Sequence, residues 1–387
     1  IDYSKRREFK NNIYIPTLRK EFPIEKAELL SDINNPFLVI RVNGIRVFCK
    51  GGNWGMDDAM KKVSRETLEP SFRLHRDANF NMIRNWTGQS TEPVFFDLAD
   101  EYGMMIWNDF WISTEGFNLN PLDDQLFLDN SLDMIRRYRN HASIAIWCPR
   151  NEGYAPVGIE NDLATQIAKE DGTRHYQGNS RSINLRPSGP WHFFENNKDY
   201  FTKLGNGFTT EIGTFSVPEA SSIRKFIGAE DLWPINDVWH YHDLHINNQN
   251  LQGYLHMADS LYGPSKNLDD FNRKIQLINY DSHRAIFEAW NSNLWSQSSG
   301  VLLWMSHPAW PSMIWQTYSW DFQTHGSYYG SKKACEPLHI QMNLNNNQVV
   351  IVNTSLHALA GAKAGMQVFN MDGGLLQSKS VTVDISS

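Results

Sequence analysis

The sequence predicts an α/β fold, a (β/α)8 TIM barrel followed by a small, truncated β-sandwich segment of the immunoglobulin type. Short apolar runs alternate with helical patterns, and most of these runs stop on polar or aromatic residues. After Cys335 the helical patterns give way to hairpin patterns. We therefore expect an N-terminal segment at 1–36, the barrel at 37–334 and the start of a β domain at 335–387.

The first half of the expected barrel consists of four strand–helix pairs. Ser64 is a suitable cap for the first helix, and Thr91, followed by Pro93, for the second. Gly103 is a typical stop for that second helix. In chain order the expected elements are strand 47–54, helix 64–77, strand 81–86, helix 91–103, strand 104–109, helix 124–139, strand 144–152 and helix 160–169.

The second half has weaker signals but completes eight strands. Residues 212–267, rich in Trp, His and Asn, are expected to form a functional loop at the barrel rim. A doubly wound open sheet is the alternative, but no Gly-x-Gly-x-x-Gly follows the first strand. The remaining expected elements are strands 174–178, 190–194 and 207–211, helix 268–294, strand 300–305, and two hairpins pairing 339–344 with 348–352 and 366–370 with 378–384.

Composition narrows the possible partners. The chain has 387 residues, a net charge of −7, 41% hydrophobic residues and no basic cluster, which argues against nucleic acid and membrane as partners. The three cysteines are too few and too scattered for a disulfide framework or a zinc site. The first residues are charged and polar rather than a signal peptide. Because the chain begins with Ile1 rather than Met, we expect a processed form or a piece of a longer polypeptide.

Two glutamates are the most informative residues. Glu152 ends the apolar run at 144–152, and Glu211 ends the run at 207–211. Strands that end in this way deliver carboxylates to the mouth of a barrel. Cleaving a glycosidic bond with retention requires two carboxylates ~5–5.5 Å apart, one acting as acid and one as nucleophile. The alternative for each glutamate is a solvated strand end in an ion pair, but the pair favours a sugar-cleaving enzyme.

Around these glutamates the chain resembles glycoside hydrolase family 2, in the branch of β-mannosidases, endo-β-mannosidases and exo-β-glucosaminidases. The resemblance implies a retaining barrel enzyme in which Glu152 is the acid/base and Glu211 the nucleophile. It differs from the family in having Pro149-Arg150 where a glycine is common and in lacking the family's N-terminal sugar-binding-like domain. The resemblance covers residues 37–345 and is carried by Gly51-Gly-Asn-Trp54, Ile83-Arg-Asn-Trp86, Phe96-Asp-Leu-Ala-Asp-Glu-Tyr-Gly103, Ile106-Trp-Asn-Asp-Phe-Trp111 and the glutamate pair.

Other strand ends supply candidate substrate-binding residues. Asn151 is placed to bond the sugar 2-OH, with a turn-forming role as the alternative. Arg84 is placed to order and charge-stabilise Glu211, with a structural ion pair as the alternative. Trp304 resembles the floor of the sugar subsite, with core packing as the alternative. Further candidates for the subsite are Trp54, Trp86, Asp109, Trp111 and His192.

The most favoured activity is that of an exo-acting retaining β-glycosidase with a β-mannoside, part of an oligosaccharide or glycan, as substrate. An exo-β-glucosaminidase is the close alternative, and it would need a further carboxylate for the substrate ammonium, either Asp109 or Glu115. A β-galactosidase would fit the same glutamate pair, and a non-catalytic carbohydrate-binding protein on the same fold would represent a different class of function. A glycan-degrading role would suit the periplasm or the extracellular space.

No cofactor or metal is expected. His240, His242 and His245 resemble a metal cluster, but their spacing matches no common zinc signature, so we expect histidines of a rim loop. Gly51-Gly-Asn-Trp-Gly55 lacks the Lys-Ser/Thr of a phosphate loop. A serine hydrolase is disfavoured because no Gly-x-Ser-x-Gly occurs.

Overall fold

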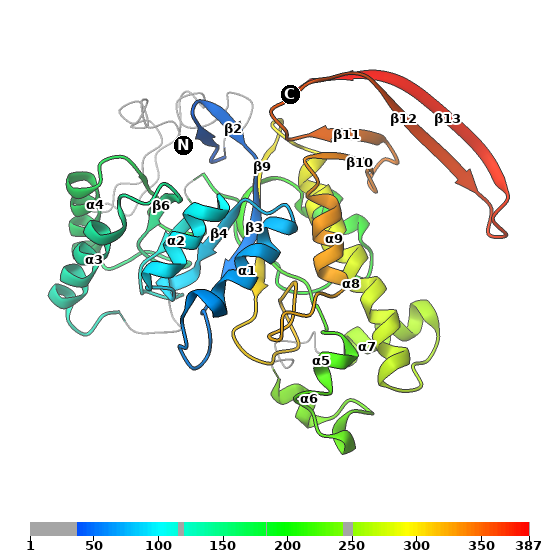
Figure 1. Cartoon of the computed structure of the whole chain (residues 1–387), viewed down its shortest axis with the longest axis horizontal. Helices are drawn as coiled ribbons and strands as arrows, with labels where there is room; N and C mark the ends of the chain where they lie inside the picture. Colours follow the sequence, from blue (N-terminus) through cyan, green and yellow to red (C-terminus); the bar gives the residue numbers. More distant parts are fainter. Residues whose placement is uncertain (1–36, 115–119, 183, 243–250, 387) are drawn as a thin grey trace.

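A computed structural model describes residues 37–114, 120–182, 184–242 and 251–386 (Figure 1). Its centre is a parallel sheet in the order β7-β6-β5-β4-β3-β9-β8, which curls as a TIM barrel does. The expected barrel fold is therefore confirmed. The strands are β3 (Cys49–Trp54), β4 (Met82–Asn85), β5 (Met105–Asp109), β6 (Ile144–Cys148), β7 (His175–Tyr176), β8 (Gly207–Ile212) and β9 (Ser298–His307).

Helices follow most of these strands, and local sequence sets their ends. Ser64 caps α1 through the backbone of Thr67 in a capping box, as expected. The second helix is capped by Glu92 rather than Thr91, without a side-chain bond, but Gly103 ends it in the left-handed conformation as predicted. The helices are α1 (Arg65–Asp77), α2 (Pro93–Tyr102), α3 (Asp124–Tyr138), α4 (Val157–Glu170), α5 (Ala220–Ile223), α6 (Asp237–Tyr241), α7 (Leu251–Tyr262), α8 (Leu268–Asn291) and α9 (Gly326–Ala334).

The strand expected at 190–194 does not form. Instead, the preceding loop lies beside β8 and bonds to its backbone: the amides of Arg186 and Gly189 donate to the carbonyls of Phe208 and Glu211. Pro187 and Pro190 interrupt this pairing, because proline has no backbone N–H for a regular ladder. An irregular loop therefore stands where the sixth strand of the barrel was predicted.

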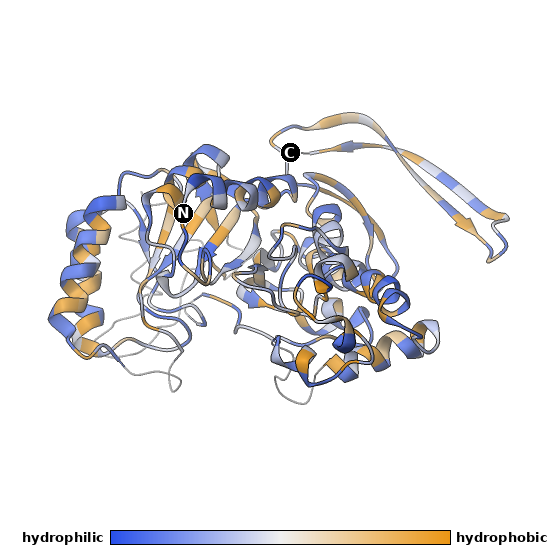
Figure 2. Cartoon of the chain, turned by 60° about the horizontal axis from the view of Figure 1, so that its bottom comes forward, coloured by the Kyte–Doolittle hydropathy of each residue, from blue (hydrophilic) through white to orange (hydrophobic). Residues whose placement is uncertain are grey.

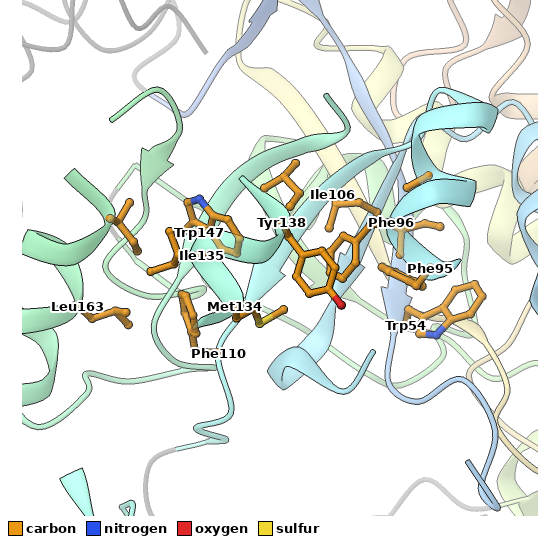
Figure 3. Close-up of a cluster of buried hydrophobic side chains, with 14 of the residues drawn as sticks. Trp54, Phe95, Phe96, Ile106, Phe110, Met134, Ile135, Tyr138, Trp147 and Leu163 are labelled. Atoms are coloured by element: carbon orange, nitrogen blue, oxygen red, sulfur yellow. The ribbon is translucent and has the colours of Figure 1, made fainter. Parts of the chain in front are cut away.

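Buried aromatic side chains fill the space between the sheet and its outer helices. One cluster joins β3, β5 and β6 to α1, α2, α3 and α4, and Figure 3 shows Trp54, Phe95, Phe96 and Trp147 among its members. Trp54 packs between Phe72, Phe95 and the ring of His307, which lies parallel to it at 3.7 Å. These aromatic side chains are therefore core residues.

Small antiparallel hairpins lie at both ends of the described chain. β1 (Ile40–Val42) and β2 (Ile45–Val47) were not predicted, and Asn43 and Gly44 make their turn with φ of 51° and 80°. The two predicted C-terminal hairpins are confirmed as β10 (Leu338–Met342) with β11 (Val349–Asn353) and β12 (Leu359–Phe369) with β13 (Leu375–Ile385). Figure 2 shows the β12–β13 hairpin projecting away from the barrel. The predicted segment at 1–36 lies outside the described residues.

Candidate active site

The carboxyl ends of the parallel strands meet around Arg84, the third residue of β4. Its guanidinium is completely buried and bonds to side chains from four other places in the barrel. Nη1 lies 2.7 Å from Oε1 of Glu211 on β8 and 3.2 Å from Oδ1 of Asn53 on β3. Nη2 lies 2.6 Å from Oδ2 of Asp109 on β5 and 2.6 Å from Oδ1 of Asn151, just beyond β6. Arg84 thus connects β4 to side chains on β3, β5 and β8 and to the residue Asn151 after β6.

Glu211 is held at both carboxylate oxygens. Oε1 accepts from Arg84, and Oε2 accepts from Nε1 of Trp191 at 3.0 Å. Burial raises the pKa of Glu211 to about 7; the positive charge of Arg84 opposes that increase and the nearby charge of Glu152 adds to it. The charge of one predicted glutamate therefore acts on the other.

Glu152 has a different environment. Its backbone φ is 38°, a left-handed conformation that non-glycine residues rarely adopt, and its amide donates to Oγ of Ser180 at 3.0 Å. Oγ of Ser188 donates to Oε1 of Glu152 at 2.6 Å. The structure gives Oε2 no partner within the described ranges, so one oxygen of this carboxyl group is available to another molecule.

Asn151 links the surroundings of the two glutamates. Its Oδ1 accepts from Arg84 at 2.6 Å and from Oγ of Ser180 at 3.1 Å. Its Nδ2 donates to Oγ1 of Thr114 at 2.7 Å, which leaves the second amide hydrogen for a further acceptor. The carbonyl oxygen of Asn151 is thus committed to the protein, and any bond to a sugar would come from the amide nitrogen.

Aromatic rings surround one side of the site. Trp304, near the end of β9, packs edge-to-face against Trp86 at 5.1 Å and against Trp315 at 6.3 Å. Nε1 of Trp315 donates to the carbonyl of Trp191, the residue that bonds Glu211. All four indoles are partly exposed. A Cβ at Gly213, two residues after Glu211, would lie 2.6 Å from the carbonyl of Trp304, so glycine is required for this close approach.

Several predicted substrate residues lie elsewhere or have a different role. Trp54 is completely buried in the core cluster, which corrects its assignment to a sugar subsite. Asp109 is also completely buried, and both of its carboxylate oxygens accept hydrogen bonds from the protein. The donors are the Arg84 guanidinium, Nε1 of Trp107 and the amide of Thr87, so Asp109 binds Arg84 rather than a substrate. Arg84 is also completely buried and bonds Glu211, a contact that fits both the predicted ordering of Glu211 and the structural ion pair given as its alternative.

Trp111 and His192 are placed by their contacts with the protein. Nε1 of Trp111 donates to the carbonyl of Gly88, and its ring packs against Phe110 and Phe127. Nδ1 of His192 lies 3.0 Å from the carbonyl of Phe193. Neither side chain bonds a glutamate of the pair within the described ranges, whereas Arg84 bonds Glu211 directly and Asn151 bonds Arg84.

The expected rim histidines are placed in part. Nδ1 of His242, just after α6, lies 2.7 Å from the carbonyl of Pro311, and its ring stacks on Trp310. His245 and Glu115 lie outside the described residues. Among the residues that the structure describes, no group of three His, Cys, Asp or Glu side chains is arranged to hold a metal ion. No helix within the described ranges is long and apolar enough to cross a membrane.

Sequence reasoning missed four residues that complete the site. Their positions in loops gave no local signal, although Trp191 is adjacent to His192, which was predicted. The only sequence signal was the pair Pro187 and Pro190, because two prolines this close together disfavour a regular strand. The missed residues are Ser180, Ser188, Trp191 and Trp315.

Comparison with known proteins shows which proteins the chain is similar to. Residues 37–188 match the model described as "Glycosyl hydrolases family 2, TIM barrel domain". Over 87% of its length the chain is 33% identical to a mannosylglycoprotein endo-beta-mannosidase of Lilium longiflorum, of which the match covers 41%. Over 95% of its length it is 29% identical to an exo-beta-D-glucosaminidase of Streptomyces avermitilis, of which the match covers 43%. The chain thus spans less than half the length of these relatives.

Solved structures agree on the fold. An exo-chitosanase from Amycolatopsis orientalis superposes with a TM-score of 0.84 at 23% identity, over 91% of this chain and 45% of that one. A beta-D-mannosidase from Dictyoglomus thermophilum superposes with a TM-score of 0.77 at 22% identity, over 92% and 48%. The fold thus agrees with the match of residues 37–188 to the TIM barrel domain of glycoside hydrolase family 2.

Proposed function

We propose that this chain forms the catalytic barrel of a retaining β-glycosidase, with Glu211 as nucleophile and Glu152 as acid/base. One observation carries the proposal. The two carboxyl groups share the mouth of the barrel, but Glu211 has donors on both oxygens, one of them the Arg84 guanidinium, whereas Glu152 keeps one oxygen without a partner among the described residues. Donors on both oxygens stabilise an anion, and a free oxygen suits proton transfer.

In the first step, an oxygen of the Glu211 carboxylate forms a bond to the anomeric carbon as the bond from that carbon to the leaving oxygen breaks. The electron pair of the broken bond goes to the leaving oxygen, which takes the proton from Oε2 of Glu152. Arg84 and Trp191 hold Glu211 throughout, so little reorganisation accompanies the attack.

In the second step, water replaces the leaving group. The water oxygen attacks the anomeric carbon while Glu152, now a carboxylate, removes a proton from that water. The bond from the anomeric carbon to Glu211 breaks, and its electron pair returns to the Glu211 carboxylate. Two inversions give overall retention. The charge on Glu211 is absent in the intermediate, which favours Glu152 as a base at this stage.

We favour an exo-acting enzyme for β-mannosides over an exo-β-glucosaminidase. A glucosaminidase needs a carboxylate for the substrate ammonium, and Asp109, one of the two candidates, is already bonded on both oxygens by the protein. The lily relative, which is named an endo-beta-mannosidase, supports an internal β-mannosyl residue as a second possibility. Comparing oligosaccharides with terminal and internal β-mannosyl residues separates the two modes.

The test is hydrolysis of p-nitrophenyl β-mannoside, β-glucosaminide and β-galactoside by the wild type, Glu152→Ala and Glu211→Ala. The proposal predicts activity on the mannoside, its loss in both variants, and rescue of Glu152→Ala alone by azide with a β-mannosyl azide as product. Both variants matching the wild type would overturn the site assignment. Binding without hydrolysis by the wild type would favour a carbohydrate-binding protein.

A further inference from the structure

We infer that Ser188 is a positioning residue that directs the proton of Glu152 to the leaving group, an inference that rests on the proposed function. Oγ of Ser188 donates to Oε1 of Glu152 at 2.6 Å. A carboxyl group with one oxygen engaged in this way carries its transferable proton on the other. Ser188 therefore selects Oε2 and fixes the plane of the carboxyl group.

The backbone at Glu152 makes such support necessary. Its φ of 38° places the residue in a left-handed region that side chains disfavour, so surrounding bonds must hold the conformation. Ser180 supplies one of these bonds, from the amide of Glu152 to its Oγ, and Oγ of Ser180 donates in turn to Asn151. Ser180 thus fixes the backbone, while Ser188 fixes the carboxyl end of the side chain.

The loop that carries Ser188 is rigidly built. Nη1 of Arg186 donates to the carbonyls of Pro187 and Gly189, both at 2.9 Å, and closes the turn around Ser188. Gly189 has φ of 82°, and a Cβ there would lie 3.1 Å from the indole of Trp191. The amide of Gly189 donates to the carbonyl of Glu211 at 2.8 Å, which attaches the loop to β8. The position of Ser188 is therefore set by the strand that carries Glu211.

This arrangement couples the two carboxyl groups through one loop. Ser188 bonds Glu152, and Trp191, three residues later, bonds Glu211. Loss of the Ser188 hydroxyl would free the Glu152 carboxyl group to rotate without removing a partner of Glu211. Catalysis should then suffer where protonation of the leaving group matters and be spared where it does not.

The experiment compares wild type, Ser188→Ala and Ser188→Thr on aryl β-mannosides whose phenols range from acidic to weakly acidic. For Ser188→Ala we expect kcat/KM to fall about tenfold to a hundredfold with the weakly acidic phenols, the loss typical of one bond to a group that becomes charged as it gives up its proton. With 2,4-dinitrophenol as leaving group, which needs no proton, we expect a change of about twofold or less. Ser188→Thr keeps the hydroxyl and should restore most of the loss.

Ser182→Ala is the matched control. Oγ of Ser182 bonds the side chain of Asn179 in the same turn and lies 3.4 Å from the hydroxyl of Tyr154, and within the described ranges it bonds neither glutamate. This variant should leave the dependence on the leaving group unchanged. An equal loss of activity of Ser188→Ala on every leaving group, or no loss on any, would overturn the inference. Failure of the wild type to cleave any of these glycosides would instead contradict the proposed function itself.

Discussion

Replacing Arg84 with methionine tests whether one buried cation stabilises the mouth of the barrel. Arg84 forms ion pairs of 2.6 Å with Asp109 and 2.7 Å with Glu211, and all three side chains are buried. Methionine has a similar length but would leave two buried carboxylates without their counter-charge. Removing one partner from a buried ion pair costs about 3–5 kcal/mol of unfolding free energy. For a chain of 387 residues, the loss corresponds to a decrease in Tm of roughly 4–6 °C.

The same variant should shift the pH dependence of catalysis. The pKa of Glu211 is raised to about 7 by burial, against the opposing charge of Arg84. Loss of an adjacent cation raises a carboxyl pKa by about 1–3 units, so the acid limb of kcat/KM should move to higher pH by that amount. The attacking group must be ionised, and at pH 7 its ionised fraction falls from about half to about a tenth or less.

Thermal unfolding and the pH profile of kcat/KM measure both effects. Arg84→Lys is the control, since it keeps the charge but loses the guanidinium fork, and it should shift the acid limb less than Arg84→Met does. A methionine variant with an unchanged Tm and an unchanged acid limb would refute the reasoning.

Three further predictions concern the rim, the core and acid stability. Trp304→Ala should lower kcat/KM about tenfold or more at constant Tm, whereas Trp54→Ala should lower the free energy of unfolding by about 3–5 kcal/mol. A loss of stability without loss of activity in Trp304→Ala, and the opposite in Trp54→Ala, would contradict the placement of these indoles. Gly213→Ala should lower activity, because its Cβ would collide with the Trp304 carbonyl, and wild-type kinetics would contradict that contact. The contribution of the buried histidines to the free energy of unfolding should be fully present above about pH 6.5 and fall toward pH 4. Their pKa values are lowered in the folded state, so they take up protons when the chain unfolds at acid pH. A Tm that stays constant over that range would contradict this prediction. These histidines, with pKa values of about 4 or 3, are His75, His283, His307 and His325.

The positions of the charged strand ends could be predicted from the sequence because the barrel fold fixes them. Glu211 and Arg84 each close an apolar run, and parallel strands bring such ends to one mouth. Glu152 follows the end of β6 by four residues and still reaches the site, held by Ser180. For these residues, assignment to a strand end was enough to predict a position at the mouth of the barrel.

The orientation of neighbouring strand residues could not be predicted in the same way. Successive side chains on a strand point to opposite faces, so only one residue of Asn53-Trp54 can face the barrel interior. The structure places Asn53 there, bonded to Arg84, and packs Trp54 outward against α1 and α2. An indole at a strand end can pack either in the barrel interior or against the outer helices. The sequence alone did not show which of these two faces Trp54 is on.

The loop residues were missed because their contacts depend on the tertiary structure. Trp191-His-Phe-Phe194 has the composition of a strand, and this local preference outweighed the prolines on either side of Ser188. Ser188 and Trp191 meet Glu152 and Glu211 only because the loop runs along β8. No spacing in the sequence encodes that path.

Trapping the glycosyl-enzyme tests the central claim most directly. A 2-deoxy-2-fluoro-β-mannosyl fluoride should slow both chemical steps while keeping a good leaving group, so the intermediate accumulates. After proteolysis, mass spectrometry should find a single fluoromannosyl group on the peptide that carries Glu211, and no adduct should form in Glu211→Gln. An adduct on Glu152 or another residue, or continued turnover of aryl mannosides without any covalent adduct, would contradict the assignment of Glu211 as the nucleophile.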